Sequence, residues 1–130
     1  MTDSTLAERN KALVAQFVAD IWNAKQFDKL QNYVAAEYVQ HNPNLPNGRA
    51  ALEEFLKVHY LQNMPTGDFS IARLVAEGDL VVAHSLFRLN PTDRGTAVVD
   101  IYRISNDRLV EHWDVREPVP EDSASGNPVV

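Results

Sequence analysis

Cysteine is absent from the 130-residue sequence, which excludes disulfide bonds, thiolate nucleophiles and the cysteine ligands of zinc fingers. Long apolar runs are absent as well, and none approaches the roughly 20 residues that a membrane-spanning helix needs. The first residues, MTDSTLAERNK, lack the basic and then apolar layout of a secretory signal. We therefore expect a cytoplasmic protein that does not insert into a membrane.

Basic residues are scarce relative to acidic ones. The chain has 12 Lys and Arg against 18 Asp and Glu, which gives a net charge of −6. Nucleic acids and anionic membranes are bound through Lys and Arg that neutralise phosphates, so this balance argues against both partners. The sequence also has no Gly-rich phosphate loop and no nucleophile elbow. Nothing in it therefore supports nucleotide-dependent or serine-hydrolase chemistry.

Helical periodicity dominates the first half of the chain. Apolar spacing predicts a helix that ends at about Trp22, a short helix from Asp28 through Val34, and a third helix from Arg49. Residues 38–48, YVQHNPNLPNG, contain two prolines, three asparagines and a glycine. We expect a loop there, after at most a short extended piece.

Strand-like alternation dominates the second half. Strand patterns cover residues 70–76 and 80–89, and residues 98–115 are typical of a β-hairpin. Helices followed by consecutive strands indicate an α+β fold with an antiparallel sheet. The length suits one domain, which we assign to residues 1–116. Residues 117–130, rich in Pro, Ser and acidic side chains, are expected to form a tail that is flexible or packs on a partner.

The most informative stretch is the expected hairpin, VVDIYRISNDRLVEHWDV (residues 98–115). Strand alternation places Val110, His112 and Asp114 on one face of its second strand. If Asp100 of the first strand faces the same way, two carboxylates and an imidazole share one space. Such a cluster is a common basis for proton transfer. The alternative is that these side chains form the wet face of a half-exposed sheet.

The opposite face of the hairpin is apolar. It carries Val99, Ile101, Trp113 and Val115. An apolar surface of this kind is unusual in a monomer, so we expect a homodimer that forms through the outer face of the sheet.

A metal site is a further possibility to weigh. The His-x-Asp string at 112–114, with His84 or His41, offers two imidazoles and a carboxylate. No His-x-x-x-His or comparable ligand spacing occurs in the chain. We therefore expect neither a metal nor another cofactor.

Two segments resemble a known superfamily. Residues 33–56, YVAAEYVQHNPNLPNGRAALEEFL, resemble the second helix, rim loop and third helix of the cone-shaped fold shared by nuclear transport factor 2, ketosteroid isomerase, scytalone dehydratase and the polyketide cyclases. Residues 98–115 resemble its last two strands. The Gln-His-Asn-Pro and Glu-His-Trp-Asp strings are most similar to the SnoaL-like polyketide cyclase group. The resemblance implies N-terminal helices packed on a curved antiparallel sheet that encloses a pocket, and sheet-face dimers.

The resemblance also implies roles for residues. Asp100 matches an aspartate that is protonated in ketosteroid isomerase and donates to a developing oxyanion. His41 falls near the place of the isomerase's base, and Asp114 matches the acid/base of SnoaL-like cyclases. Phe17 stands where the isomerase has its oxyanion tyrosine, and the missing hydroxyl argues against steroid-type isomerisation. His112 is expected to line the cavity or to orient the carboxylates.

Together these features predict a cofactor-free acid/base enzyme that acts on a small hydrophobic carbonyl compound, by intramolecular aldol cyclisation, isomerisation or dehydration. The competing interpretation is a non-catalytic ligand-binding or scaffold domain, since this fold hosts both classes. For two residues a structural role is the alternative: His84 as a core histidine and His59 in packing. The expected catalytic residues are His41, Asp100, His112 and Asp114. The expected substrate-binding residues are Phe17, Trp22, Phe55, His59, His84 and Tyr102.

Overall fold

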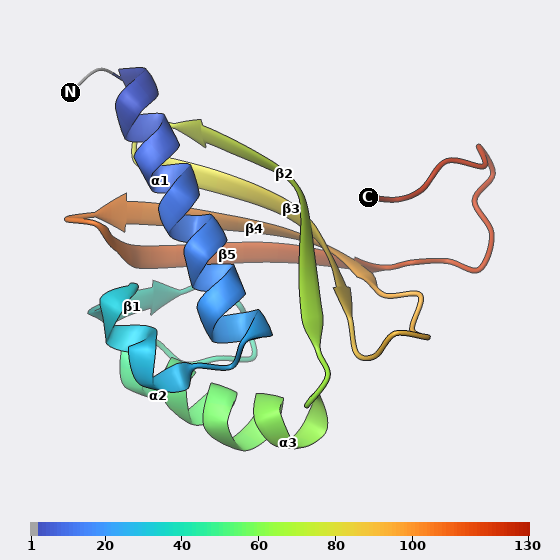
Figure 1. The fold of residues 1–130 in the computed structure, drawn as a ribbon, viewed down its shortest axis with the longest axis horizontal. Coiled ribbons are helices and arrows are strands. Elements are labelled where there is room, and N and C mark those ends of the chain that lie inside the picture. Colours follow the sequence, from blue (N-terminus) through green and yellow to red (C-terminus); the bar gives the residue numbers. More distant parts are fainter. Residues whose placement is uncertain (1–2) are drawn as a thin grey trace.

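A computed structural model describes residues 3–130, in which helices pack against the concave face of a curved five-stranded sheet (Figure 1). The helical segments are α1 (Asp3–Phe17), the π-helical η1 (Val18–Asn23), the 3-10 helix η2 (Phe27–Asn32), α2 (Arg49–Glu54), the π-helical η3 (Phe55–Tyr60) and α3 (Leu61–Asn63). The strands are β1 (Val34–Gln40), β2 (Asp68–Glu77), β3 (Leu80–Arg88), β4 (Thr96–Ser105) and β5 (Arg108–Pro118). The strand order is β1-β5-β4-β3-β2.

Strand β1 differs from the sequence-based expectation. The short second helix ends at Asn32, and the next segment is a strand that pairs in parallel with β5. Hydrogen bonds hold both ends of this strand. The Leu109 N–H donates to the Tyr33 carbonyl at 2.7 Å, and the His41 N–H donates to the His112 carbonyl at 2.9 Å. The sheet is therefore mixed: antiparallel from β2 to β5, with one parallel strand at its edge.

The hairpin of β4 and β5 forms as predicted, with one local correction. Asn106 and Asp107 both have positive φ, 51° and 59°, as a tight two-residue hairpin turn requires. The register shifts between Arg103 and Ile104, so Val110 is an extra residue on β5. Leu109 rather than Val110 is therefore buried in the core, fully shielded from solvent. Beyond the bulge the expected alternation resumes.

The core lies between the sheet and the helices. α1 and η1 contribute Val14, Phe17 and Ile21, which are at most 1% exposed. Leu56 and Tyr60 of η3 close the other side. Burying each large apolar side chain contributes about 1.5–3 kcal/mol. This burial holds the helices against the concave face, and the pocket lies between them and the sheet.

Two further features concern membrane-spanning helices and the C-terminal segment. No helix among residues 3–130 is both long and apolar enough to cross a membrane. Strand β5 continues to Pro118, beyond the expected domain boundary, and the residues after it leave the sheet (Figure 1). The Val119 N–H donates to the Gly95 carbonyl at 3.0 Å. That the tail is flexible or packs on a partner stays a prediction.

Candidate active site

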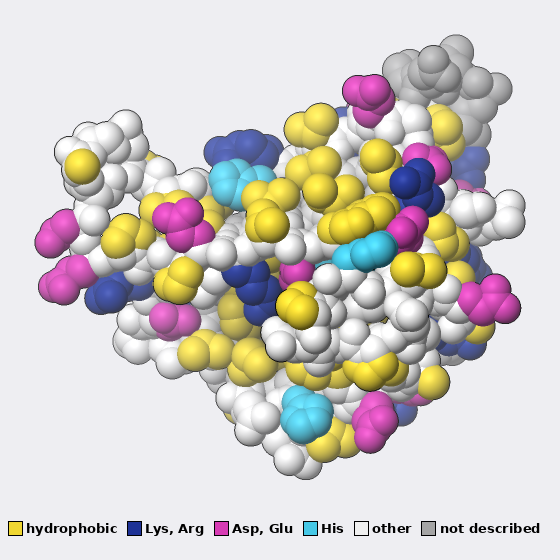
Figure 2. Space-filling view, turned by 180° about the vertical axis from the view of Figure 1, so that it is seen from behind, with side chains coloured by type: hydrophobic (Ala, Val, Ile, Leu, Met, Phe, Trp, Pro, Cys, Tyr) yellow, Lys and Arg dark blue, Asp and Glu magenta, His cyan; other side chains and the backbone are white. Residues whose placement is uncertain are grey.

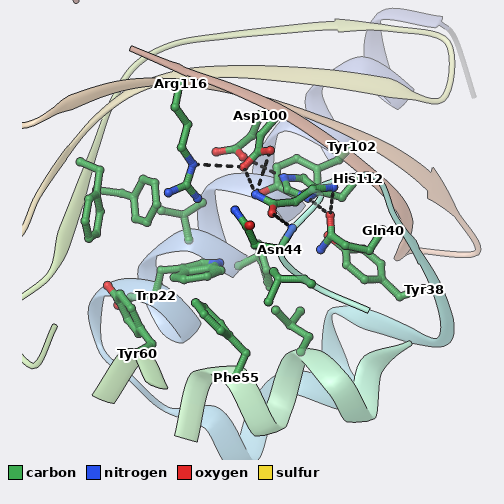
Figure 3. A pocket seen from close by; sticks show the side chains of 18 of the residues that line it. Trp22, Tyr38, Gln40, Asn44, Phe55, Tyr60, Asp100, Tyr102, His112 and Arg116 are labelled. Atoms are coloured by element: carbon green, nitrogen blue, oxygen red, sulfur yellow. Dashed lines mark hydrogen bonds and ion pairs between the residues drawn. The ribbon is translucent and has the colours of Figure 1, made fainter. Parts of the chain in front are cut away.

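A cavity of about 160 Å³ lies between the concave face of the sheet and the helices (Figure 3). One end of it is a cluster of aromatic rings. The ring of Trp22 lies 4.9 Å from that of Tyr60, 5.5 Å from Phe69 and 6.4 Å from Phe55, centroid to centroid. Cavities of about this size accept one benzene-sized ring. The apolar end is therefore suited to a single ring or a short branched chain.

The polar end of the cavity is built by the hairpin. Asp100 and Asp114 are direct partners across β4 and β5, and His112 lies opposite Tyr102. All four side chains line the cavity, so the two strand faces coincide, which alternation alone left open and the family resemblance implied. Asp100 and His112 are each 8% exposed, and the side chain of Asp114 is 4% exposed. Two carboxylates and an imidazole are thus buried together.

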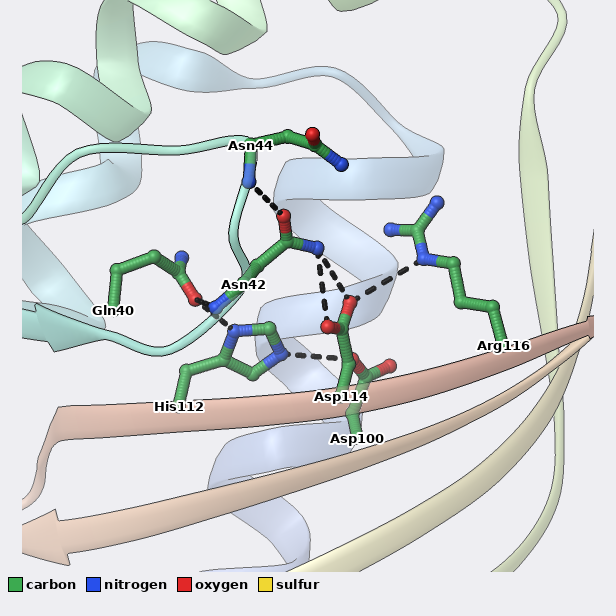
Figure 4. Close-up of polar contacts among 7 residues, drawn as sticks. All are labelled: Gln40, Asn42, Asn44, Asp100, His112, Asp114 and Arg116. Carbon is green, nitrogen blue, oxygen red and sulfur yellow. Dashed lines mark hydrogen bonds and ion pairs between the residues drawn. The ribbon is translucent and has the colours of Figure 1, made fainter.

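The hydrogen bonds of His112 define where its protons lie (Figure 4). The backbone N–H of Asn42 donates to Gln40 Oε1 at 3.0 Å, so that atom acts as an acceptor. His112 Nδ1 is 2.7 Å from the same oxygen and therefore donates a proton to it. His112 Nε2 lies 2.8 Å from Asp100 Oδ1. A hydrogen bond between these two atoms needs one proton, so imidazole and carboxyl hold a single proton between them.

Asp114 is held by donors from two elements. The backbone N–H of Asn44 donates to Asn42 Oδ1 at 2.9 Å, which orients the Asn42 amide. Asn42 Nδ2 then donates to both oxygens of Asp114, at 3.1 Å and 3.0 Å. Arg116 Nε donates to Asp114 Oδ2 at 3.3 Å. Asp114 is therefore an acceptor on all sides, as an ionised carboxylate is.

Two tyrosines flank His112. Its ring centroid lies 4.9 Å from that of Tyr102 and 6.3 Å from that of Tyr38. Burial, and then the charge of Asp100, raise the pKa of both phenols well above the usual value of 10. Both therefore remain neutral hydroxyls at physiological pH, and neither competes as a base.

Three of the expected site histidines, His41, His59 and His84, do not line the cavity, which corrects their expected placement. The side chain of His41 is 41% exposed and binds Glu111 Oε2 through Nε2 at 2.7 Å. His84 pairs with Val99 on the outer face of the sheet and contacts Arg73 there. Figure 2 shows this outer face, where hydrophobic side chains gather beside histidine and arginine side chains.

His59 lies outside the cavity, although its ring still contacts that of Phe55, with centroids 6.0 Å apart. Along the π-helical η3, the cavity is lined by Phe55 and, five residues later, by Tyr60. His59 is exposed. Of the expected substrate-binding set, the cavity is lined by Phe17, Trp22, Phe55 and Tyr102.

Gln40, Asn42, Asn44 and Arg116 also line the polar end, although the sequence did not single them out. The parallel pairing of Gln40 with His112 brings the first three there, whereas Arg116 shares a face of β5 with His112 and Asp114 by alternation. The signals available in the sequence were the density of amide side chains around Pro43 and the period of two along β5.

The structure also bears on metal binding. Neither His41 nor His84 joins the carboxylates. Within residues 3–130, the cluster of side chains spaced to hold an ion is Asp100, His112 and Asp114, whose ligand atoms lie within 4.8 Å of one another. In this arrangement His112 Nε2 faces Asp100 rather than open space, so the three groups form a hydrogen-bonded network.

Comparisons with known proteins agree with this architecture. A family model described as a SnoaL-like domain matches residues 14–112. No curated protein matches the sequence. The fold is similar to that of a candidate polyketide cyclase from Acidithiobacillus ferrooxidans, at 23% identity and a TM-score of 0.72, over 84% of this chain and 88% of that one. TsrD from Streptomyces laurentii matches at 21% identity and a TM-score of 0.69, over 85% and 89%. A candidate ketosteroid isomerase from Kribbella flavida matches at 16% identity and a TM-score of 0.73, over 90% and 84%.

Proposed function

Since the chain belongs to the SnoaL-like domain family, and since its cavity joins an apolar end to a carboxylate–imidazole network, we propose that it catalyses cofactor-free acid/base chemistry on a small hydrophobic carbonyl compound. The reaction class is proton abstraction next to a carbonyl. Intramolecular aldol cyclisation, isomerisation and dehydration all begin with that step.

The proposed roles follow from the hydrogen bonds. Asp114 takes the proton from the carbon next to the carbonyl. The electron pair of the broken C–H bond forms a C=C bond, and the π pair of the carbonyl moves onto its oxygen. The proton shared by His112 and Asp100 is hydrogen-bonded to that oxygen as its negative charge develops. In an aldol closure, the enolate carbon attacks a second carbonyl of the same molecule. The proton lost from carbon is finally balanced by one gained at the new alkoxide.

One observation carries this proposal: the fixed orientation of His112 between Gln40 and Asp100. It leaves a single transferable proton at the polar end of an otherwise apolar cavity. Electrostatic interactions are stronger there than in water, because little solvent screens them. A proton-sharing pair beside an ionised carboxylate is a general acid and a general base in one site.

A non-catalytic ligand-binding domain is the second candidate. Its support is that the carboxyls already have partners within the protein: Asp100 in His112, and Asp114 in Asn42 and Arg116. A network satisfied in this way can serve as a rigid polar wall for a bound molecule.

Exchange of ketone α-protons with deuterated water, followed by NMR, separates the two candidates. We expect exchange with at least one member of a panel of small aromatic and aliphatic ketones. Asp114→Asn keeps the shape but removes the base, and should lower the rate by about 100-fold to 10,000-fold. Asp122→Asn, an exposed change in the tail, is the matched control. No exchange by the unmodified protein across the panel would favour the binding domain. Full exchange in both Asp114→Asn and Asp100→Asn would refute carboxyl catalysis.

A further inference from the structure

Arg116 extends from β5 over the mouth of the cavity with unused hydrogen-bonding capacity (Figure 3). Its Nε atom contacts Asp114 at 3.3 Å. Its two terminal nitrogens have no hydrogen-bond partner in the part of the chain that the structure describes. The side chain is 53% exposed. The free edge of the guanidinium is therefore open both to the cavity and to solvent.

Asn44 lies on the other side of the mouth. Its backbone N–H is used by Asn42, but its side-chain amide makes no hydrogen bond within residues 3–130. Figure 4 shows the Asn44 amide and the Arg116 guanidinium pointing toward one another. Asn44 belongs to the rim loop, residues 41–48 between β1 and α2, and Arg116 belongs to β5. Three NH2 groups, two from Arg116 and one from Asn44, thus face one space beside the carboxylate–imidazole network.

The charges around this space are balanced without a ligand. His112 and Asp100 share one proton and are neutral in sum. Asp114 is offset by Arg116. The terminal edge of a guanidinium matches the two oxygens of a carboxylate, which it binds through two parallel hydrogen bonds. A carboxylate brings one further negative charge beside Asp114, whereas a phosphate dianion would bring two, and Arg116 is the cation that faces either of them.

We propose that Arg116 and Asn44 form a carboxylate subsite, so that the substrate is a small keto acid with one apolar ring or short branched chain. The ring occupies the aromatic end around Trp22, and the carboxylate remains at the mouth, where it keeps part of its hydration. The carbonyl then lies between them, beside Asp114 and the His112–Asp100 pair. The carbonyl part of this assignment rests on the proposed function, whereas the carboxylate part stands on binding alone.

The test uses a matched pair of unreactive probes, 3-phenylpropanoate and its methyl ester, measured by isothermal titration calorimetry. The carboxylate preference is defined as the Kd of the ester divided by the Kd of the acid. We expect a preference of about fivefold in the unmodified protein, modest because the arginine is half exposed. Rising salt should reduce it. Arg116→Met should bring it to about one, and Arg116→Lys should retain part of it.

Control variants separate the subsite from general charge and from catalysis. Arg88→Met removes an equal charge from an exposed position outside the cavity and should leave the preference unchanged. Asp114→Asn should keep or increase the preference, because it removes a nearby negative charge, even where proton exchange is lost. The subsite proposal and the proposed function can therefore fail separately.

Two results would overturn the proposal. Equal binding of acid and ester to the unmodified protein, at low salt, would exclude a carboxylate subsite. Binding of neither probe at millimolar concentration would exclude a single-ring ligand. If Arg116→Met fails to fold, the salt series and Arg116→Lys still decide the question.

Discussion

The imidazole of His41 lies flat against the indole of Trp113, with ring centroids 4.8 Å apart and planes inclined by 2°. The Arg103 guanidinium carbon lies 5.7 Å from the same indole centroid. Glu111 accepts hydrogen bonds from both His41 and Arg103, and these bonds hold the pKa of the Glu111 carboxyl below its usual value. This cluster lies on the outer face of the sheet. Asn42, the residue after His41, turns inward, and its side-chain amide donates to Asp114. The stack therefore anchors the rim loop that orients Asp114.

His41→Ala should leave proton exchange largely intact, because the side chain lies outside the cavity. We expect a rate loss of less than tenfold and a loss of about 1 kcal/mol in unfolding free energy, the typical contribution of one ring pair. Exchange kinetics and denaturant unfolding measure the two effects. His41→Phe, which keeps the stacking but not the hydrogen bond to Glu111, should recover part of the stability. A rate loss as large as that of Asp114→Asn would instead place His41 in the chemistry.

The hairpin illustrates what the sequence could predict. Its period of two put His112 and Asp114 on one face of the second strand, but it left open whether Asp100 faces the same way. Ser105 pairs with Arg108 at the turn, and strict alternation from that pair would set Asp100 opposite Trp113. The extra residue Val110 shifts the register so that Asp100 pairs with Asp114. The outward position of Trp113 follows from the same alternation. A bulge cannot be read from alternation, however, and Val110 was misplaced for that reason.

The polar end of the site needed a long-range contact that no local pattern contains. Residues 35–37 are Ala-Ala-Glu, good helix formers, and they lie in a strand because β1 pairs with β5. That pairing brings Gln40 to His112 and Asn42 to Asp114. The sequence misplaced His84 for a different reason. Its strand alternates as expected, but both faces carry apolar residues, so the pattern did not say which face is inside.

The outer face of the sheet predicts a homodimer. Val99, Ile101, Trp113 and Val115 lie there, and Val115 is 66% exposed. The unmodified protein should therefore have twice the monomer mass by light scattering at micromolar concentration. Val115→Glu should shift it to monomer with unchanged circular dichroism, because burying an unpaired carboxylate is costly. Val58→Glu, on an exposed helical position, is the control. A monomeric unmodified protein would contradict the prediction.

The hydrogen bond from the Tyr33 hydroxyl to Asp20 should make stability depend on pH. This bond lowers the pKa of the Asp20 carboxyl below 3.8 and, after burial, helps raise the pKa of Tyr33 to about 12. A carboxyl whose pKa is lowered on folding contributes stability above its unfolded pKa, and this is lost as the pH falls through the folded value. Tyr33→Phe should thus destabilise the protein at neutral pH but less so in acid. Denaturant unfolding over a pH series measures this difference, and a constant difference across the series would contradict it.

Gln40 is predicted to act as a positioning residue for the proton pair. Its side-chain oxygen accepts from His112 Nδ1 and from the Asn42 N–H. Gln40→Leu leaves both donors without an acceptor, at a cost of about 1–3 kcal/mol each if they stay buried. It also frees His112 to carry its proton on either nitrogen, so the nitrogen shifts of the ring in NMR spectra should lose their single-tautomer pattern.

Gln40→Glu separates this role from simple packing. Glutamate offers an acceptor at the same position, so it should restore the tautomer and most of the exchange activity, whereas Gln40→Leu should lose roughly tenfold or more. A purely structural role would lower stability in Gln40→Leu without changing the His112 nitrogen shifts or the pH–rate profile. That outcome would remove Gln40 from the mechanism. It would also weaken the argument that His112 and Asp100 hold one proton, because that argument depends on Nδ1 donating to this oxygen.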